Sequence, residues 1–482
     1  MAHSVLENYP DYEVVIGIEI HVQLNTKSKI FCGCANTVAQ SPNTYICPVC
    51  SGYPGVLPVL NSAVLKSALL AGLATNCTIA PVSEFARKHY FYPDLPKNYQ
   101  ITQSDVPIAS NGTVEIKLED GTFKTIRIMR IHIEEDAGKN IHSALSNESF
   151  VDLNRTGTPL LEIVTQPDIA STYEARTYLK TVRSIVQYLK ICSGNMEEGA
   201  FRADTNISVR KKGAEKLGTR CELKNINSFK FISDAIEYEI ERQITQLESG
   251  KKIIQETRLW DTKEHKTVSM RSKEEAADYR YMIDPDLPRI IVTEEHLLSI
   301  KNQMPELPAE KFERFVKEYA LTPYEAEIMI NDLLLADYYE QAYAHKSSKL
   351  LINWVLRDIM GLLKENMTLD QLKVTPKKLA NLVGLISDSV INNRAAQEVF
   401  LALVETGKEP ELLVKELGLE QMGDSQELEK IIQEIIRANP KQAADYRSGK
   451  DKLWGFFVGQ AMQKTKGKGN PQLIEELLKK HL

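Results

Sequence analysis

Cysteine is scarce in this chain, with 7 residues among 482. Small secreted domains stabilised by disulfides contain far more, so a disulfide framework is excluded. The first residues lack the basic and apolar regions of a secretory signal, and the acidic start does not resemble a transit peptide. Even the weakly polar stretch 67–83 contains Asn76 and Pro81, which excludes a membrane span. These absences predict a cytoplasmic protein that does not enter a membrane.

Positive charge is not in excess either, since 59 Lys and Arg residues face 65 Asp and Glu residues, a net charge of −6. This balance excludes nucleic-acid binding through bulk charge but allows a local basic surface. The chain also lacks a P-loop and a dinucleotide fingerprint, so any nucleotide must be bound in another way. No amidase-type Gly/Ser segment or Cys–His pattern indicates a glutaminase or hydrolase nucleophile.

The spacing of apolar residues and turn residues predicts several domains, as expected for this length. Residues 1–293 alternate strands with helices, and the expected elements are strands 13–24, 113–118, 123–134, 149–153 and 201–210 and helices 171–191 and 228–248. A hairpin-type turn at 119–121 favours antiparallel pairing, so we expect an α+β domain built on an antiparallel sheet. Residues 294–405 and 406–482 are expected to form an all-α domain and a small all-α tail.

Four of the cysteines lie close together in the sequence, at Cys32, Cys34, Cys47 and Cys50. In a reducing compartment such a quartet is typical of a tetrahedral Zn²⁺ site. Chance clustering and an iron–sulfur cluster are the alternatives. A site with four thiolates has no open coordination position, so its expected role is structural.

The strand GIEIHVQL at 17–24 places Glu19 and His21 on one face, because side chains two apart on a strand point the same way. Other strand-like segments also alternate polar and apolar residues, and their polar faces offer further carboxylates, namely Glu134 or Glu135, Asp204 and Glu222. Carboxylate-rich polar faces suit a hard divalent cation such as Mg²⁺, which prefers oxygen ligands. The alternative is a solvated sheet face.

Two further segments mix basic residues with features of nucleic-acid binding. The run RKHYFYPDLPKNYQITQ at 87–103 interleaves basic and aromatic residues, which is typical of base stacking and phosphate binding. A tightly packed loop is the alternative reading. Near the end, the segment 441–470 is locally basic and includes Lys464, Lys466 and Lys468. It predicts contact with a phosphate backbone, against the alternative of a solubilising loop.

These segments, in this order, resemble the B subunits of the tRNA-dependent amidotransferases. The resemblance spans the whole chain and includes the motifs GIEIHVQL, RKHYFYPDLPKNYQ, HIEEDAGK, VDLNRTGTPLLEIV, MEEGAFRADTNIS, ELKNINSF and VGQAMQKTKGKGNP. It implies a glutamine synthetase-like cradle domain over 1–293, a helical domain over 294–405 and a YqeY-like tail over 406–482.

The resemblance also implies a reaction and its components. ATP phosphorylates the side-chain carboxyl of Glu-tRNA(Gln) or Asp-tRNA(Asn), and ammonia from a separate A subunit then displaces phosphate. A C subunit completes the complex, and the tail binds tRNA through Lys464, Lys466 and Lys468. A non-catalytic tRNA-binding scaffold and a free-standing zinc-dependent RNA-binding protein are the alternatives.

Matching the family motifs assigns the Mg²⁺ ligands, and it favours Glu135 over Glu134, a choice that the strand pattern leaves open. The implied set is Glu19, His21, Glu135, Asp204 and Glu222. Some family members lack the cysteine quartet, which agrees with a structural role for Zn²⁺.

Overall fold

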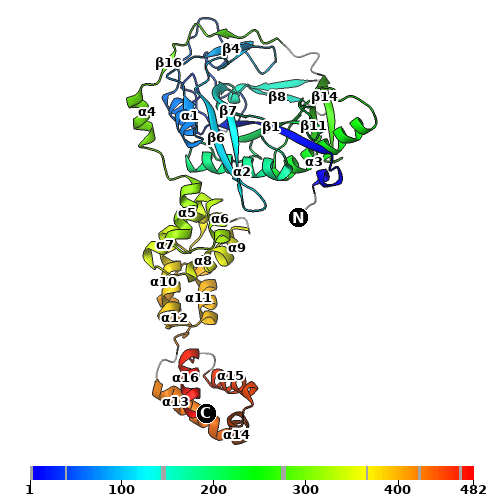
Figure 1. Ribbon diagram of the computed structural model, residues 1–482. Helices are drawn as coiled ribbons and strands as arrows, with labels where there is room; N and C mark the ends of the chain where they lie inside the picture. Colours follow the sequence, from blue (N-terminus) through cyan, green and yellow to red (C-terminus); the bar gives the residue numbers. More distant parts are fainter. Residues whose placement is uncertain are drawn as a thin grey trace. The chain divides into compact units, whose positions relative to one another are not determined.

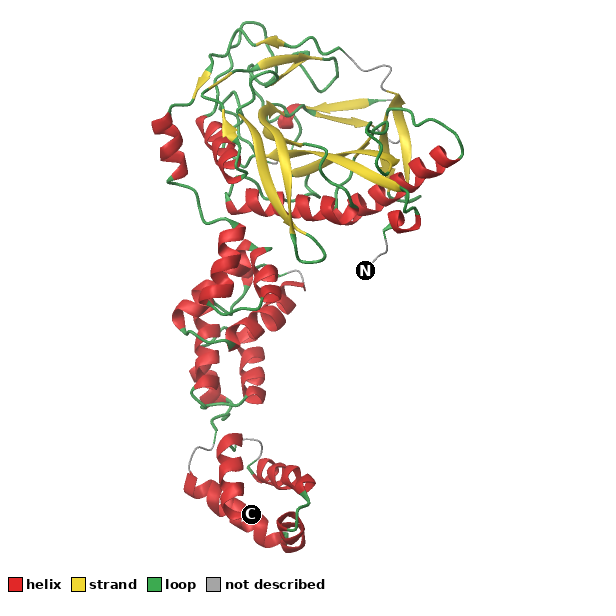
Figure 2. Ribbon diagram, viewed as in Figure 1, coloured by secondary structure: helices red, strands yellow, loops and turns green. Residues whose placement is uncertain are grey.

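The structure is a computed structural model that describes residues 4–37, 41–142, 148–272, 278–364, 367–421, 425–465 and 469–482. The chain divides into two compact units, Met1–Glu310 and Lys311–Leu482. The first unit contains the β-sheets, and the second is helical in its described part (Figure 2).

A nine-stranded sheet forms the centre of the first unit. In spatial order its strands are β14 (Lys266–Ser272), β13 (Glu256–Asp261), β12 (Cys221–Lys224), β11 (Phe201–Lys211), β1 (Tyr12–Gln23), β10 (Pro159–Thr165), β7 (Phe123–Glu135), β6 (Ala109–Lys117) and β2 (Thr78–Ile79). Neighbouring strands are antiparallel except β12 and β13, which run parallel. The α+β class is therefore confirmed, but the sheet is mixed rather than antiparallel throughout. The likeness to glutamine synthetase stays a prediction.

One face of this sheet is apolar and covered by helices. Along β1 every second side chain is buried, from Val14 to Val22, and so are the alternate side chains of β11. Helices α2 (Thr172–Tyr188) and α3 (Phe229–Glu248) pack on this face, as Figure 1 shows. Ser171 and Ser228 cap these helices by accepting hydrogen bonds from backbone amides in the first turn. The opposite face is left to the polar side chains.

Shorter elements surround the sheet. They are a three-stranded sheet of β15 (Met282–Ile283), β4 (Ala86–His89) and β5 (Tyr99–Thr102), the pairs β16 (Ile290–Ile291) with β3 (Val82–Ser83) and β8 (Lys139–His142) with β9 (Ser149–Asp152), and helix α1 (Ser62–Ala74). Strand β5 packs against β7. The expected hairpin joins β6 to β7, and Gly121 adopts the positive φ of +86° that its turn requires.

The first unit extends beyond the expected boundary at residue 293. Helix α4 (Glu294–Lys301) packs on α1, and Ile300 lies in the same core as the sheet. This helix buries its apolar side against the first core and therefore belongs to the first unit, which ends at Glu310.

Two separate apolar cores are found beyond that point. The first includes side chains of α5 (Pro308–Glu318), α6 (Pro323–Ile330), α7 (Leu333–His345), α8 (Leu350–Trp354), α10 (Pro376–Ser387), α11 (Asn393–Thr406) and α12 (Pro410–Glu416), with α9 (Met360–Lys364) packed against it. The second is built by α13 (Ser425–Ala438), α14 (Pro440–Arg447), α15 (Trp454–Lys464) and α16 (Pro471–His481). Leu413 and Val414 belong to the former core, so α12 does not join the tail as expected from the boundary at 406.

A π-helical turn, Val355–Ile359, separates α8 from α9. Within the described ranges, none of the helices combines the length and the apolar character needed to cross a bilayer.

Substituting a core residue of the central sheet should destabilise the first unit. Leu161 on β10 is fully buried, so Leu161→Ala should lower the free energy of unfolding by roughly 2–5 kcal/mol. Native-state hydrogen exchange of the β1 and β10 amides measures this loss. Phe123→Ala, at a site that is 68% exposed, is the control and should change it by no more than about 0.5 kcal/mol. Equal effects of the two substitutions would contradict the assigned core.

Candidate functional site

The polar face of the nine-stranded sheet carries a row of ionisable side chains across three strands. His21 on β1 lies opposite Glu162 on β10, which lies opposite His132 on β7. Residues directly opposite in an antiparallel pair point to the same face, so all three share it. His21 Nε2 lies 3.5 Å from Glu162 Oε2 and 3.6 Å from Glu134 Oε1. Ligand atoms of His21, Glu134 and Glu162 all fall within 4.8 Å of one another, close enough to bind one ion.

Glu134 and Glu135 end β7 and point in opposite directions. Glu134 faces His21, whereas Glu135 accepts a hydrogen bond from the Ile101 amide at 2.9 Å and forms an ion pair with Lys97. Since side chains alternate along a strand, only one of the two can join the row. The structure brings Glu134 to His21, so the preference for Glu135 drawn from the family motif does not match the geometry.

Glu19, Asp204 and Glu222 form a second group on the same face. Glu19 on β1 lies opposite Asp204 on β11 and accepts a hydrogen bond from Asn206 Nδ2 at 3.0 Å. Lys224 Nζ lies 2.8 Å from Asp204 Oδ2 and 3.1 Å from Glu222 Oε1. The three carboxylates thus lie on neighbouring strands beside His21, Glu134 and Glu162, but two of them, Asp204 and Glu222, contact the Lys224 ammonium. The five expected ligands do not surround a single point.

The crowding of carboxylates is costly in the absence of a cation. Burial raises the pKa of Glu19, and the neighbouring charges of Glu162 and Glu222 raise it further. The charge of Asp204 also raises the pKa of Glu19, and among the strongest influences only the charge of Lys224 lowers it. A divalent ion on this face would relieve the repulsion.

His132 and Thr102 orient the carboxylate of Glu134. His132 Nε2 lies 3.6 Å from Glu134 Oε2 and 3.2 Å from Glu162 Oε2, and Thr102 Oγ1 donates to Glu134 Oε2 at 3.3 Å. Burial lowers the pKa of His132, but the two carboxylates outweigh it and raise the pKa to about 9. With Oε2 engaged in this way, Glu134 turns its Oε1 toward His21.

Sequence reasoning missed Glu162 and His132. Glu162 is the one charged residue of the mostly apolar strand PLLEIVT, and this isolation was a usable signal. His132 stands two positions before Glu134 in RIHIEED, so strand periodicity places the two on the same face.

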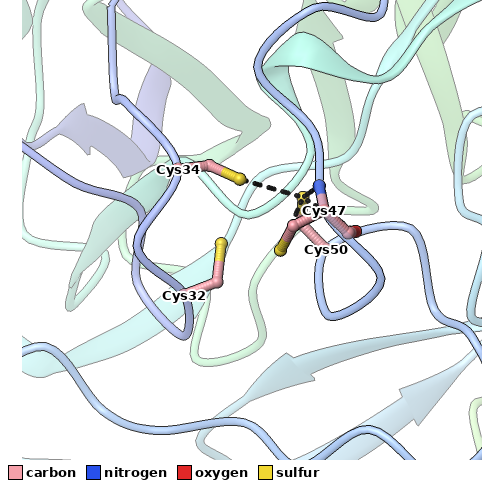
Figure 3. Close-up of side chains that lie close together, drawn as sticks. All are labelled: Cys32, Cys34, Cys47 and Cys50. Atoms are coloured by element: carbon pink, nitrogen blue, oxygen red, sulfur yellow. Dashed lines mark hydrogen bonds between the residues drawn. The ribbon is translucent and has the colours of Figure 1, made fainter.

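The cysteine quartet forms a compact cluster, shown in Figure 3. Cys50 Sγ lies 3.9 Å from Cys47 Sγ and 4.0 Å from Cys34 Sγ, and the four sulfur atoms lie within 4.8 Å of one another. Lys29 is fully buried with its ammonium 3.7 Å from Cys50 Sγ. Contacts with the Cys32 thiol, the Cys47 amide and Lys29 lower the pKa of Cys50 to about 4. The arrangement fits a four-thiolate metal site, because thiolates are the binding form.

The basic–aromatic run at 87–103 forms β4, β5 and the loop between them. Arg87 stacks on Tyr99, with 4.4 Å from guanidinium carbon to ring centroid, which supports the packed-loop reading for these residues. Phe91 and Tyr92 in the loop are 78% and 56% exposed and stay available for contacts.

The tail lysines are described only in part. Lys464 ends α15 and forms an ion pair with Glu434 at 2.5 Å. Lys466 and Lys468 lie outside the described residues.

Comparison with known families covers most of the chain. The GatB/GatE catalytic domain matches residues 14–298, which contain both groups of carboxylates and the cysteine cluster. The family described as the GatB domain matches residues 337–482.

Curated relatives are similar over nearly the full length. The B subunits of the aspartyl/glutamyl-tRNA(Asn/Gln) amidotransferases of Thermodesulfovibrio yellowstonii and Geotalea daltonii are 51% and 52% identical, each across 98% of this chain and 99% of the relative. The corresponding protein of Myxococcus xanthus is 50% identical over the same shares. With such identity across whole chains, this protein belongs to the family of aspartyl/glutamyl-tRNA(Asn/Gln) amidotransferase B subunits.

Proposed function

We propose that this chain uses ATP to activate the side-chain carboxyl of Glu-tRNA(Gln), Asp-tRNA(Asn) or both, on the polar face of its nine-stranded sheet. Family membership makes it a subunit of a ligase-type tRNA amidotransferase. The observation that carries the finer proposal is the convergence of His21, Glu134 and Glu162 within 4.8 Å on that face.

The donor set of this cluster fits Mg²⁺. It offers two carboxylates and one imidazole, and the low exposure of Glu134 and Glu162 favours ligands that stay in place. Mg²⁺ bound there supplies charge neutralisation for phosphate oxygens during phosphoryl transfer. Glu19, Asp204 and Glu222 lie beside it as further oxygen donors, and Lys224 forms ion pairs with two of them, Asp204 and Glu222.

The proposed reaction has two balanced steps. A carboxylate oxygen of the tRNA-borne side chain attacks the γ-phosphorus of ATP, and ADP leaves with the electrons of the broken bond. Ammonia then attacks the acyl carbon, loses a proton, and phosphate leaves, which gives the amide. In this account His132 and Thr102 hold Glu134 in position, so that no reorganisation of that carboxylate is needed as charge moves.

The other components are those that family membership implies. We infer that an amidase-type A subunit supplies ammonia and that a C subunit completes the complex, which agrees with the lack of a recognisable glutaminase nucleophile in this sequence. We assign structural Zn²⁺ to the cysteine cluster, and contact with the tRNA backbone to the tail with Lys464, Lys466 and Lys468.

Adjacent glutamates provide a matched test of the metal site. Glu134→Gln should weaken Mn²⁺ binding by about 10-fold or more and abolish ATP-dependent transamidation, because it removes a ligand charge. Glu135→Gln changes the neighbouring residue on the other face and should leave Mn²⁺ affinity within about 2-fold of wild type. Titration of the reconstituted complex, followed by electron paramagnetic resonance, measures both. If Glu135→Gln weakens Mn²⁺ binding and Glu134→Gln does not, Glu135 is the ligand. Full transamidation activity of Glu134→Gln would favour a non-catalytic scaffold.

The cysteine cluster predicts a metal content close to one zinc per chain. Cys34→Ser should reduce that content to near zero and lower the melting temperature of the first unit. Elemental analysis and calorimetry measure these changes. Cys77→Ser, at a buried cysteine outside the cluster, should keep the zinc. Wild-type protein without zinc, or with iron and sulfide instead, would refute the assignment.

The tail lysines should set part of the salt dependence of tRNA binding. Replacing Lys464, Lys466 and Lys468 together by Ala should reduce the slope of log K against log salt concentration by about 1–3, since each phosphate contact releases a counterion. The exposed Lys415, changed to Ala, is the control and should leave the slope unchanged. A slope that the triple substitution does not alter would mean that these lysines only solubilise the tail.

A further inference from the structure

The ammonium group of Lys29 is buried beside the cysteine cluster. It donates hydrogen bonds to the Tyr45 carbonyl oxygen at 2.8 Å and to Cys50 Sγ at 3.7 Å. Among the residues that the structure describes, no carboxylate forms an ion pair with Lys29. A buried charge is costly unless an opposite charge lies close to it. Of the groups that this ammonium contacts, only the cysteine sulfur can carry a negative charge.

A filled cysteine cluster supplies the missing charge. Metal binding keeps the sulfurs in the thiolate form, and four thiolates with one Zn²⁺ leave a net negative charge beside Lys29. Loss of the ion would remove much of this charge and leave the ammonium buried without compensation. Groups that contact metal ligands in this way typically change metal affinity by roughly 10–100-fold when they are mutated.

Lys29 also contacts the 3₁₀ turn η2 (Leu153–Arg155), which precedes β10. Its Nζ lies 3.5 Å from the carbonyl oxygen of the first residue of this turn. The loop between the two cysteine pairs contacts the same turn, because Asn154 Oδ1 accepts hydrogen bonds from the Thr44 and Tyr45 amides at 2.8 Å each. The turn is therefore attached to the cluster through both Lys29 and this loop.

Arg155 connects the turn to the segment that follows Glu134. Its Nε donates to the Ala137 carbonyl oxygen at 3.0 Å, and its Nη2 donates to the Gly138 carbonyl oxygen at 2.5 Å. The packing here is tight, since a Cβ added at Gly138 would lie 2.9 Å from the Asp152 carbonyl oxygen. A continuous series of contacts thus runs from the cysteine cluster to the end of β7.

We propose that Lys29 is a positioning residue that couples metal binding at the cysteine cluster to metal binding at Glu134 on the polar face. This coupling rests on the proposed function. With the cluster filled, its charge attracts the ammonium and keeps η2 in place, so that Arg155 fixes the backbone after Glu134. With the cluster empty, the ammonium loses its counter-charge and the carboxylate is held less firmly. Because such coupling is reciprocal, an ion on the polar face also strengthens zinc binding.

Mn²⁺ binding to the reconstituted complex, with and without zinc in the cluster, tests the coupling. Mn²⁺ prefers oxygen ligands to thiolates, so its electron paramagnetic resonance signal reports on the polar face. Removal of zinc by a chelator under reducing conditions, followed by dialysis, should weaken Mn²⁺ binding in the wild type by about 5-fold or more.

Substitutions at Lys29 test the role of its charge. Lys29→Met should lower zinc affinity by about 10-fold or more, measured by chelator competition, and should weaken Mn²⁺ binding by about 5-fold or more. Lys29→Arg should recover part of both losses, because it keeps the positive charge. The exposed Lys27, changed to Met, is the matched control and should retain both affinities.

Arg155→Gln interrupts the series of contacts without changing the cluster, and its 42% exposed side chain makes misfolding a smaller concern than at Lys29. It should keep the wild-type zinc affinity, weaken Mn²⁺ binding by about 5-fold or more, and make that binding insensitive to zinc removal.

Two results would refute the coupling while both proposed metal sites stand. One is a wild-type Mn²⁺ affinity that does not depend on zinc, and the other is a Lys29→Met variant with lower zinc affinity but unchanged Mn²⁺ affinity. If the wild type holds no zinc or binds no Mn²⁺, the proposed function fails at that site and the coupling fails with it.

Discussion

The antiparallel register of β1 with its neighbours β10 and β11 is the constraint on which the site depends. A shift by one residue would turn Glu19 and His21 into the apolar core and expose Ile18 and Ile20, which are at most 1% accessible. Packing of α2 and α3 on the apolar face thus determines which side chains meet on the other. The free energy gained by burying the apolar face offsets the repulsion between like charges on the polar face, which would not come together without it.

The polar face combines strong repulsion with partial compensation. Lys224 offsets Asp204 and Glu222, and His132 offsets Glu134 and Glu162, yet the pKa of Glu19 stays raised by burial and by neighbouring carboxylates. Such incomplete balance is typical of sites that bind a charged ligand and less so of a solvated surface. This incomplete balance supports the proposed cation site over the solvated sheet face that the strand pattern alone also allowed.

Local patterns predicted the elements well because their causes are local. The alternation at 13–24 became β1 (Tyr12–Gln23), and the serines before 172 and 229 cap α2 and α3. Features set by distant contacts could not be predicted in this way. They include the register that pairs His21 with Glu162, the direction of Glu134 against Glu135, the parallel pairing of β12 with β13, and the packing of α4 on the first core.

The most direct test is the position of a metal ion in crystals of the complex soaked with Mn²⁺. Anomalous scattering locates the ion without reference to activity. We expect a peak within coordination distance of His21 Nε2, Glu134 Oε1 and a Glu162 oxygen, with Glu135 outside the coordination sphere. A peak at Glu135, or no peak on the polar face at saturating Mn²⁺, would contradict it.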